Sequence, residues 1–183
     1  FSSGGMQAFT FGVFIKPMSE SLGWSRAAMT GALTLYAYAG AATAPLLGRL
    51  VDRYGPRLLL ILTAIVGGSA TLLLVGIREI WQFYIIFALV GLSGGTGAGG
   101  VVTEAMVSKW FVRLRGRALA FGTMGTVVAG VLLVPLIGIV IAISGWRTAW
   151  LVVAAVFFGL LLPISLLTAR RPEDMGLLPD GAK

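Results

Sequence analysis

The side chains that could carry out chemistry in this sequence are few, and they exclude several classes of activity. None of the 183 residues is His or Cys, so there is no imidazole base and no thiolate nucleophile. Ser93, in GLSGG, has the type of a nucleophile, but no His is present to activate it. A metal could be held only by carboxylates, and Asp and Glu together number seven. We therefore predict that the protein is not an enzyme and binds neither a metal nor a cofactor.

The densest group of charges is the segment GRLVDRYGPR, residues 48–57, which stands between two uncharged runs. Asp52 could cap the N–H groups of a helix or meet the positive end of another helix. Gly55 can take the positive φ of a tight turn, and Pro56 suits the first turn of a following helix. On these grounds alone the segment could simply hold a short turn and fix the topology.

The amino-acid composition indicates whether water or lipid surrounds these motifs. Hydrophobic residues make up 57% of the chain and charged residues 11%, whereas soluble domains are roughly a quarter charged. A helix needs about 20 apolar residues to cross a bilayer; five uncharged runs reach that length, and a sixth is cut short by Lys16 and Glu20. The runs lack the period-two alternation of membrane strands. We expect an all-α membrane protein with transmembrane helices at about residues 1–22, 27–48, 57–77, 80–108, 118–144 and 147–169.

We interpret residues 1–169 as one bundle and the polar residues 170–183 as a cytoplasmic tail or the start of a linker. Because neither Met nor a basic segment precedes Phe1, we expect the chain to begin inside its first helix and not at a signal peptide. Net charge is +7, but the basic residues flank helix ends, where anionic headgroups attract them. We therefore assign this charge to contact with the lipid bilayer and expect no nucleic acid partner.

Basic residues also predict the orientation, because Lys and Arg in short loops favour the cytoplasmic side. Four of the 14 lie on one side of the expected topology: Lys16, Arg26, Arg78 and Arg147. Ten lie on the other side: Arg49, Arg53, Arg57, Lys109, Arg113, Arg115, Arg117, Arg170, Arg171 and Lys183. We predict a multi-pass protein of the plasma (inner) membrane with both chain ends in the cytoplasm.

Glycines inside the fourth run suggest how its helix packs. Gly91, Gly95 and Gly99 recur at every fourth position, so they share one helix face along which another helix can approach closely. The alternative is a bendable helix that lines a central cavity, and both can hold at once. GTGAGG, residues 95–100, matches a dinucleotide fingerprint, but that match has meaning only where a strand turns into a helix, and we reject it.

The segment at 48–57 resembles the signature of the major facilitator superfamily between its second and third helices, G-x-L-x-D-R-x-G-R-R/K. The matching residues include Gly48, Asp52, Arg53, Gly55 and Arg57, whereas the first of the two basic positions at the end of the signature is a proline here. In that family the aspartate meets a helix of the second half of the transporter. The resemblance therefore implies that these five residues form a cytoplasmic gate, and that the chain is a six-helix half made of two inverted three-helix repeats.

Four more segments are similar to the monocarboxylate porter and oxalate/formate antiporter group, especially its bacterial members. They are GVFIKPMSESLGWSR from Gly12, KWFVRLRGRALAFG from Lys109, SGWRTAW from Ser144 and RRPEDMGLLPDG from Arg170. The resemblance covers only the N-terminal half of a twelve-helix transporter. It implies alternating access for a small organic anion, a monocarboxylate or dicarboxylate, with proton symport or anion exchange. It also implies a second six-helix half, on the same polypeptide or from a dimer partner.

Glu104 lies little more than one helical turn before Lys109, inside the expected cytoplasmic end of its helix. A lone carboxylate at that depth is costly, so it needs a cationic partner, and Arg53, Arg57 and Arg115 are the candidates. The arrangement of Glu104 with Arg115 is also similar to one in sugar-type members of the superfamily. We favour a salt-bridge network; a proton carrier that faces the cavity is the alternative.

Candidates for a substrate cavity lie on the first two helices. Lys16 could hold a carboxylate, but it pairs at i, i+4 with Glu20 near the outer surface, where lysine snorkels, and we favour a structural role. The other candidates are Gln7, Thr10, Phe14, Tyr36 and Tyr38. The alternative to a transporter is a non-transporting membrane module for helix packing or assembly. A pure packing module would need neither Asp52 nor Glu104.

Overall fold

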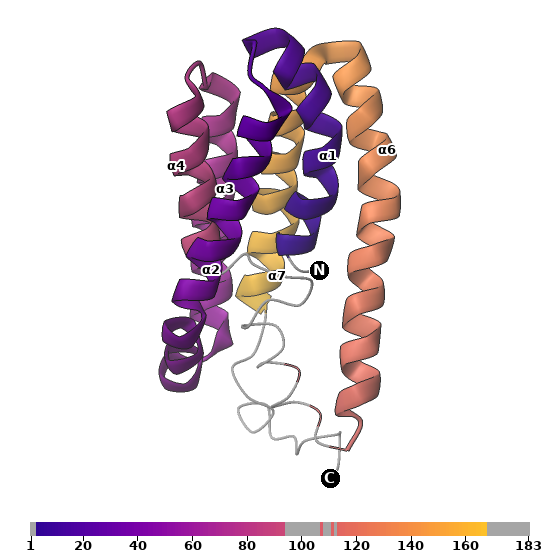
Figure 1. The fold of residues 1–183 in the computed structure, drawn as a ribbon. Coiled ribbons are helices and arrows are strands. Elements are labelled where there is room, and N and C mark those ends of the chain that lie inside the picture. The colour runs from indigo at the N-terminus through magenta and orange to yellow at the C-terminus, as the bar shows by residue number, and fades with distance from the viewer. Residues whose placement is uncertain (1–2, 94–106, 108–110, 112, 168–183) are drawn as a thin grey trace.

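The computed structural model describes residues 3–93, 107, 111 and 113–167, and every regular element in this part of the chain is a helix (Figure 1). Side chains are described from residue 11 onward, apart from those at 123, 126 and 129. The expected all-α class is therefore confirmed for these residues. The elements are α1 (Ser3–Leu22), α2 (Arg26–Tyr54), α3 (Pro56–Leu73), η1 (Leu74–Gly76, a 3-10 turn), α4 (Ile80–Leu92), α6 (Arg115–Val156), η2 (Phe157–Leu161, a π turn) and α7 (Leu162–Leu167).

α6 consists of two segments that run in opposite directions (Figure 1). The chain reverses at Gly145, whose backbone has φ 81° and ψ 168° inside an otherwise helical stretch. A side chain would strain this left-handed conformation, so glycine is the residue suited to the reversal. Over the described residues, two stretches are long and apolar enough to cross a membrane, Pro56–Gly76 and Gly130–Leu167; the second of these includes the reversal.

Local chemistry sets the ends of α2 and the start of α3. The Ser25 hydroxyl accepts a hydrogen bond from the N–H of Ala28 (3.1 Å), which satisfies one of the free donors at the start of α2. α2 then runs past its apolar stretch to Tyr54, about two turns beyond the end at residue 48 that apolarity alone predicted. The charged residues stay helical because the Gly55 N–H donates to the carbonyl of Val51 (2.9 Å) and closes the last turn.

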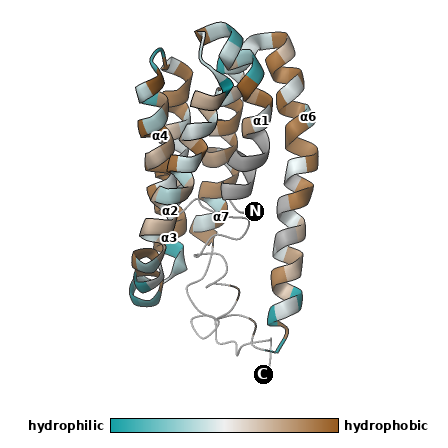
Figure 2. Ribbon diagram, viewed as in Figure 1, coloured by the Kyte–Doolittle hydropathy of each residue, from teal (hydrophilic) through white to brown (hydrophobic). Residues whose placement is uncertain are grey.

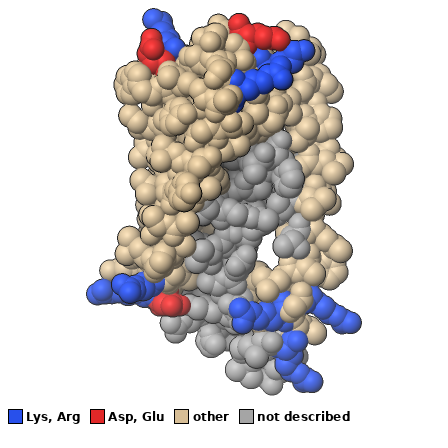
Figure 3. Space-filling view, in the orientation of Figure 1, with Lys and Arg blue, Asp and Glu red and all other residues tan. Residues whose placement is uncertain are grey.

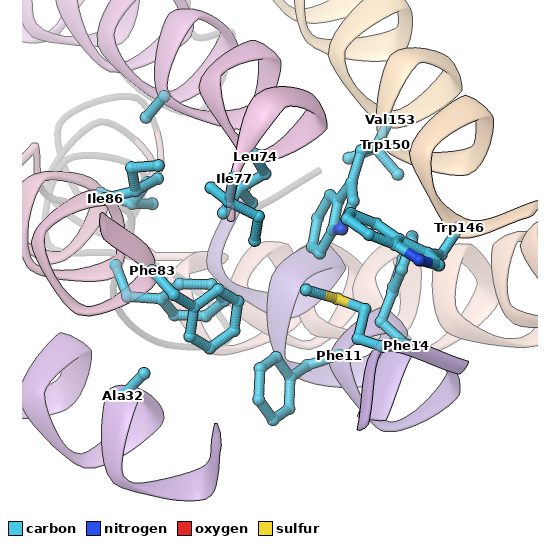
Figure 4. Packing of buried hydrophobic residues seen from close by; sticks show 14 of the residues in the cluster. Phe11, Phe14, Ala32, Leu74, Ile77, Phe83, Ile86, Trp146, Trp150 and Val153 are labelled. Atoms are coloured by element: carbon cyan, nitrogen blue, oxygen red, sulfur yellow. The ribbon is translucent and has the colours of Figure 1, made fainter. Parts of the chain in front are cut away.

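The core is a cluster of mainly large apolar and aromatic side chains, most of them from α1, α2, α4 and the second segment of α6, with Leu74 of η1 and Ile77 beside them (Figure 4). Phe14 of α1 stacks on Trp150 of α6 with ring centroids 3.9 Å apart. Phe11 meets Phe87 edge-on at 5.4 Å, and Phe83 lies 4.4 Å from Phe87. These rings interlock three helices that are distant in sequence.

Close helix contacts are built on small residues. α2 packs along α4, and a Cβ at Gly91 of α4 would collide with the carbonyl oxygen of Tyr36 and lie 3.0 Å from Ala39. The Tyr84 hydroxyl donates to the carbonyl of Ala28 (2.6 Å), opposite Gly31, and ties the same two helices together. The α2–α4 pair is therefore fixed by backbone approach as well as by side chains.

The second segment of α6 packs against α3 through a widened turn. Pro163 has no N–H to donate to the carbonyl four residues earlier, and the helix responds with the π turn η2, in which the Leu162 N–H reaches back to the carbonyl of Phe157. Phe157 lies over Gly67 of α3, where a Cβ would be 3.0 Å from its ring. The glycine leaves room for this ring.

The surface has an apolar belt between two charged ends. Figure 2 shows hydrophilic residues near the ends of the helices and hydrophobic residues between them. Figure 3 shows, on the face drawn, that the Lys, Arg, Asp and Glu side chains lie at the two ends and not in the broad band between. Bulky aliphatic side chains are exposed within this band, among them Leu62, Ile65 and Leu72 of α3 and Ile85 of α4. This is the distribution that a lipid bilayer requires.

Candidate functional site

The turn between α2 and α3 carries the charged motif at one end of the bundle. Gly55 alone links the two helices, with φ 84° and ψ 164°, and α3 begins directly with Pro56. The residues that precede and follow the turn form a small core of their own, made by Leu47, Val51 and Leu59. The turn is thus anchored on its apolar side, and the backbone that carries the charged side chains is held in place.

Asp52, Arg53 and Arg57 are exposed on this anchored turn. The Arg53 guanidinium lies 5.4 Å from the centre of the Tyr54 ring, a cation–π distance. Gly48, one turn before Asp52, has open space where a side chain would be. Of the five predicted gate residues, Gly48 is therefore partly buried and Gly55 is buried, whereas the carboxylate and the two guanidinium groups belong to exposed residues of the turn.

Asp52 is also the last residue of an exposed line along α2. Positions spaced alternately by four and three share one helix face. The members of this line, which we name the α2 seam, are Thr34, Tyr38, Ala41, Pro45, Gly48 and Asp52. All are exposed except Gly48, which is partly buried. Unlike the exposed aliphatic residues of α3, the seam consists of small or polar residues and a tyrosine that is 72% exposed.

The predicted cavity residues fall into three groups. Phe14 and Tyr36 lie inside the packed core, Phe14 against Trp150 and Tyr36 with its ring 6.5 Å from that of Phe87. Lys16 is exposed near the end of α1, and Tyr38 is exposed in the middle of α2. Gln7 and Thr10 lie on α1, but their side chains are outside the described part of the structure. The structure does not gather the described candidates around one cavity, and their role stays a prediction.

The proposed charge network cannot be assembled from the described residues. Glu104 lies outside them, as do Gly95 and Gly99, whereas Arg115 is exposed as the first residue of α6. Gly91 belongs to the described part and makes the close approach to α2 reported above. The network between Glu104 and the arginines stays a prediction.

Two polar features of the helix packing were not predicted from the sequence. The indole N–H of Trp150 is buried and has no hydrogen-bond partner among the described residues, and its ring is held by Phe14. The Thr63 hydroxyl donates to the carbonyl of Ser93 (2.7 Å), so α3 fixes the end of α4. An intramembrane Thr is a weak signal on its own, since its hydroxyl can bond within its own helix.

Two turns at opposite ends of the bundle have the same backbone geometry. Gly145, between the two segments of α6, has φ 81° and ψ 168°, and Gly55 has φ 84° and ψ 164°. In both turns a single glycine separates two helices, and an arginine follows two residues later, Arg57 in one and Arg147 in the other. Arg147 lies 4.2 Å over the Trp146 ring. Both turns thus place a cation near the start of the helix that follows.

Comparisons with known proteins identify the family of this chain. The MFS-type transporter YcxA of Bacillus subtilis is 25% identical over 92% of this chain, and the oxalate:formate antiporter of Oxalobacter formigenes is 25% identical over 92%. The multidrug resistance protein MdtG of Enterobacter lignolyticus is 37% identical over 64%. The matched regions cover 42%, 40% and 28% of these relatives, so the chain spans less than half of their length. The family profile described as Major Facilitator Superfamily matches residues 1–182, and the chain therefore belongs to the major facilitator superfamily of membrane transporters.

Proposed function

We propose that this chain is the N-terminal half of a secondary active transporter that moves a small organic anion, a monocarboxylate or dicarboxylate, by alternating access. Transport is coupled to proton symport or to anion exchange. The observation that carries the proposal is the α2 seam, because it joins an exposed face without lipid-like residues to the gate carboxylate Asp52. A transporter needs such a face, along which two halves meet and separate as the central site opens to either side.

The contrast between α2 and α3 supports a protein partner for the seam. Leu62, Ile65 and Leu72 of α3 are between 42% and 46% exposed and suit contact with lipid. Ala41 and Pro45 of the seam offer a flatter surface, and small residues are what close helix contacts in membranes use. A second six-helix half, on the same polypeptide or from a dimer partner, covers the seam and places the positive end of one of its helices at Asp52.

Six membrane-spanning helices in two inverted repeats fit the described elements. An axis in the membrane plane that exchanges the first three helices with the last three also exchanges the turn at Gly55 with the turn at Gly145, and these two turns match in backbone geometry. The same exchange converts the pair α2–α4 into the pair formed by α1 and the first segment of α6. α1 does pack against α6 there, with a Cβ position at Gly138 that lies 3.9 Å from Val13.

The orientation follows from the cations at the two ends. Of the described residues, Lys16, Arg26, Arg78 and Arg147 belong to the end with the turn at Gly145. Six belong to the end with the turn at Gly55: Arg49, Arg53, Arg57, Arg113, Arg115 and Arg117. The richer end faces the cytoplasm by the positive-inside rule. The protein lies in the plasma (inner) membrane with both chain ends in the cytoplasm.

The substrate class rests on the branch motifs in the sequence and on the likeness to an oxalate:formate antiporter. The likeness to a multidrug resistance protein is higher in identity, over a shorter part of the chain, and favours drugs as a second candidate substrate class. A single transport assay with organic anions and with drugs separates the two classes.

Counterflow into liposomes tests the proposal. Liposomes with this chain and its second half are loaded with unlabelled oxalate, formate, lactate or pyruvate, and entry of the labelled anion is followed. We expect saturable entry with both halves and none with this chain alone. Saturable counterflow by the chain alone would contradict the assignment as a half. Export of a cationic dye without anion counterflow would show that drugs, and not organic anions, are the substrates. A folded protein that moves neither kind of substrate would support the alternative, a non-transporting membrane module.

The gate is tested in the same liposomes with Asp52→Asn, which keeps the shape of the side chain and removes its charge. Glu79→Gln is the matched control, because Glu79 is an exposed carboxylate at the opposite end of the bundle. We expect Asp52→Asn to insert and fold but to cycle slowly, whereas Glu79→Gln transports at the original rate. Equal transport by both variants would leave Asp52 with a turn-holding role only.

A further inference from the structure

A groove of about 330 Å³ lies between the end of α3 and the start of α4, at the end of the bundle opposite Asp52. Ligand pockets in proteins occupy roughly 300–1,000 Å³, so the groove is at the small end of that range. Its floor is apolar and buried, and its rim is open. We name it the α3–α4 groove, and it is lined mainly by Leu73, Gly76, Ile77, Trp81, Gln82 and Ile85.

The rim of the α3–α4 groove faces the surroundings of the protein. Leu73, Trp81 and Ile85 are between 50% and 59% exposed, whereas Ile77 at the floor is 2% exposed. The exposed aliphatic residues next to it on α3 and α4 belong to the apolar belt. In a membrane protein the molecules that reach an apolar groove at this level are lipid chains. An exposed tryptophan beside a charged loop marks the boundary between chains and headgroups.

The polar groups at the outer edge of the groove suit a phospholipid headgroup. The side-chain oxygen of Gln82 accepts hydrogen bonds from the backbone N–H groups of Arg78 (3.0 Å) and Glu79 (3.2 Å). This arrangement fixes the amide at the mouth of the groove and leaves its NH2 group as a donor for an ester or phosphate oxygen. Arg78, exposed on the same loop, adds a cation that can reach a phosphate.

We propose that the α3–α4 groove is a binding site for one phospholipid of the outer leaflet. One acyl chain fills the apolar floor between α3 and α4, and the headgroup phosphate lies against Arg78 and the Gln82 amide. Arg78 makes the site prefer an anionic headgroup. This inference depends on the membrane location of the family and, for the leaflet alone, on the proposed orientation. It does not depend on what the protein transports, so the groove can fail or hold independently of the proposed transport activity.

Gly76 allows a direct test, because a Cβ at this position meets nothing within 4 Å and its φ is not positive. The first side-chain atom of Gly76→Leu therefore meets no clash, and the rest of the leucine occupies space in the groove that Gly76 lines. Ser69→Leu is the matched control, since it adds the same side chain to an exposed position of α3 outside the groove. Both variants are reconstituted in nanodiscs of phosphatidylcholine with increasing amounts of a phosphatidylglycerol brominated in one acyl chain. Bromine quenches the fluorescence of a tryptophan that it contacts, and the Trp81 signal is the difference from Trp81→Phe.

We expect the Trp81 signal to be quenched saturably at a low fraction of brominated lipid in the original protein and in Ser69→Leu. Gly76→Leu should weaken this binding roughly tenfold, the factor that corresponds to lost contact with about two methylene groups. Arg78→Gln should bind brominated phosphatidylglycerol and brominated phosphatidylcholine equally. If quenching in the original protein rises only in proportion to the brominated fraction, Trp81 contacts bulk lipid and no specific site exists, which would refute the proposal. That criterion needs no variant, so it applies even if Gly76→Leu does not fold.

Discussion

Replacing Gly91 by Ala should destabilise the bundle, although the same change usually stabilises a helix. A Cβ at Gly91 would collide with the Tyr36 carbonyl oxygen, which is backbone and cannot rotate away, and would lie 3.0 Å from the Ala39 methyl. Optimal contacts between carbon atoms are about 3.5–4.0 Å. α4 must therefore move away from α2 by roughly 0.5–1 Å, and a gap of that size forfeits about a quarter to a half of each contact it opens.

The magnitude follows from two opposing terms. Overpacking of this kind typically lowers the free energy of unfolding by about 1–3 kcal/mol. A change from Gly to Ala inside a helix raises it by roughly 0.5–1 kcal/mol. We expect a net loss of about 1–2 kcal/mol in the free energy of unfolding. For a chain of this size each kcal/mol shifts Tm by roughly 2–4 °C, so Tm should fall by about 2–8 °C.

Thermal unfolding in detergent, followed by tryptophan fluorescence, measures this shift. Gly122→Ala is the matched control, because Gly122 is exposed on α6 and a Cβ there meets nothing within 4 Å. It should leave Tm unchanged or raise it. If Gly91→Ala proved as stable as Gly122→Ala, the close α2–α4 approach would not exist in the folded protein, and the packing argument would fail.

Three further predictions concern the gate, the topology and the core. Asp52→Asn should slow the transport cycle at least tenfold while its Tm stays within about 2 °C of the original, because an exposed charge contributes little to stability; a matching fall in Tm would point to folding. Single cysteines at Ser25 and Ser144 should react with an impermeant thiol reagent from outside and one at Tyr54 only from inside, and the reverse labelling would refute the orientation. Phe14→Ala should cost about 3–5 kcal/mol in unfolding free energy, since the ring is fully buried; denaturant titration would show a smaller loss if the ring lined an open cavity.

The lipid surroundings, the helical class and the family could all be inferred from the sequence alone. Long uncharged runs can satisfy their backbone groups in lipid only as helices or closed barrels, and the absence of a period-two pattern excludes the barrel. The segment at 48–57 also located a turn correctly, because Gly55 and Pro56 act on the chain within a few residues. These effects act between residues that are close in the sequence, so the sequence predicts them.

The sequence did not show which faces of the helices are buried, and this becomes clear only from how the helices pack. Phe14 was a candidate for the substrate cavity, and it lies against Trp150 in the core, whereas Tyr38 is exposed on the α2 seam. The helices are apolar on nearly all sides, and in lipid an apolar side chain gains little by turning inward. Apolarity therefore selects no face, so the partner of each face is set by steric fit between helices, such as Gly91 against α2. That fit joins residues far apart in the chain, and it becomes visible only when the helices are placed side by side.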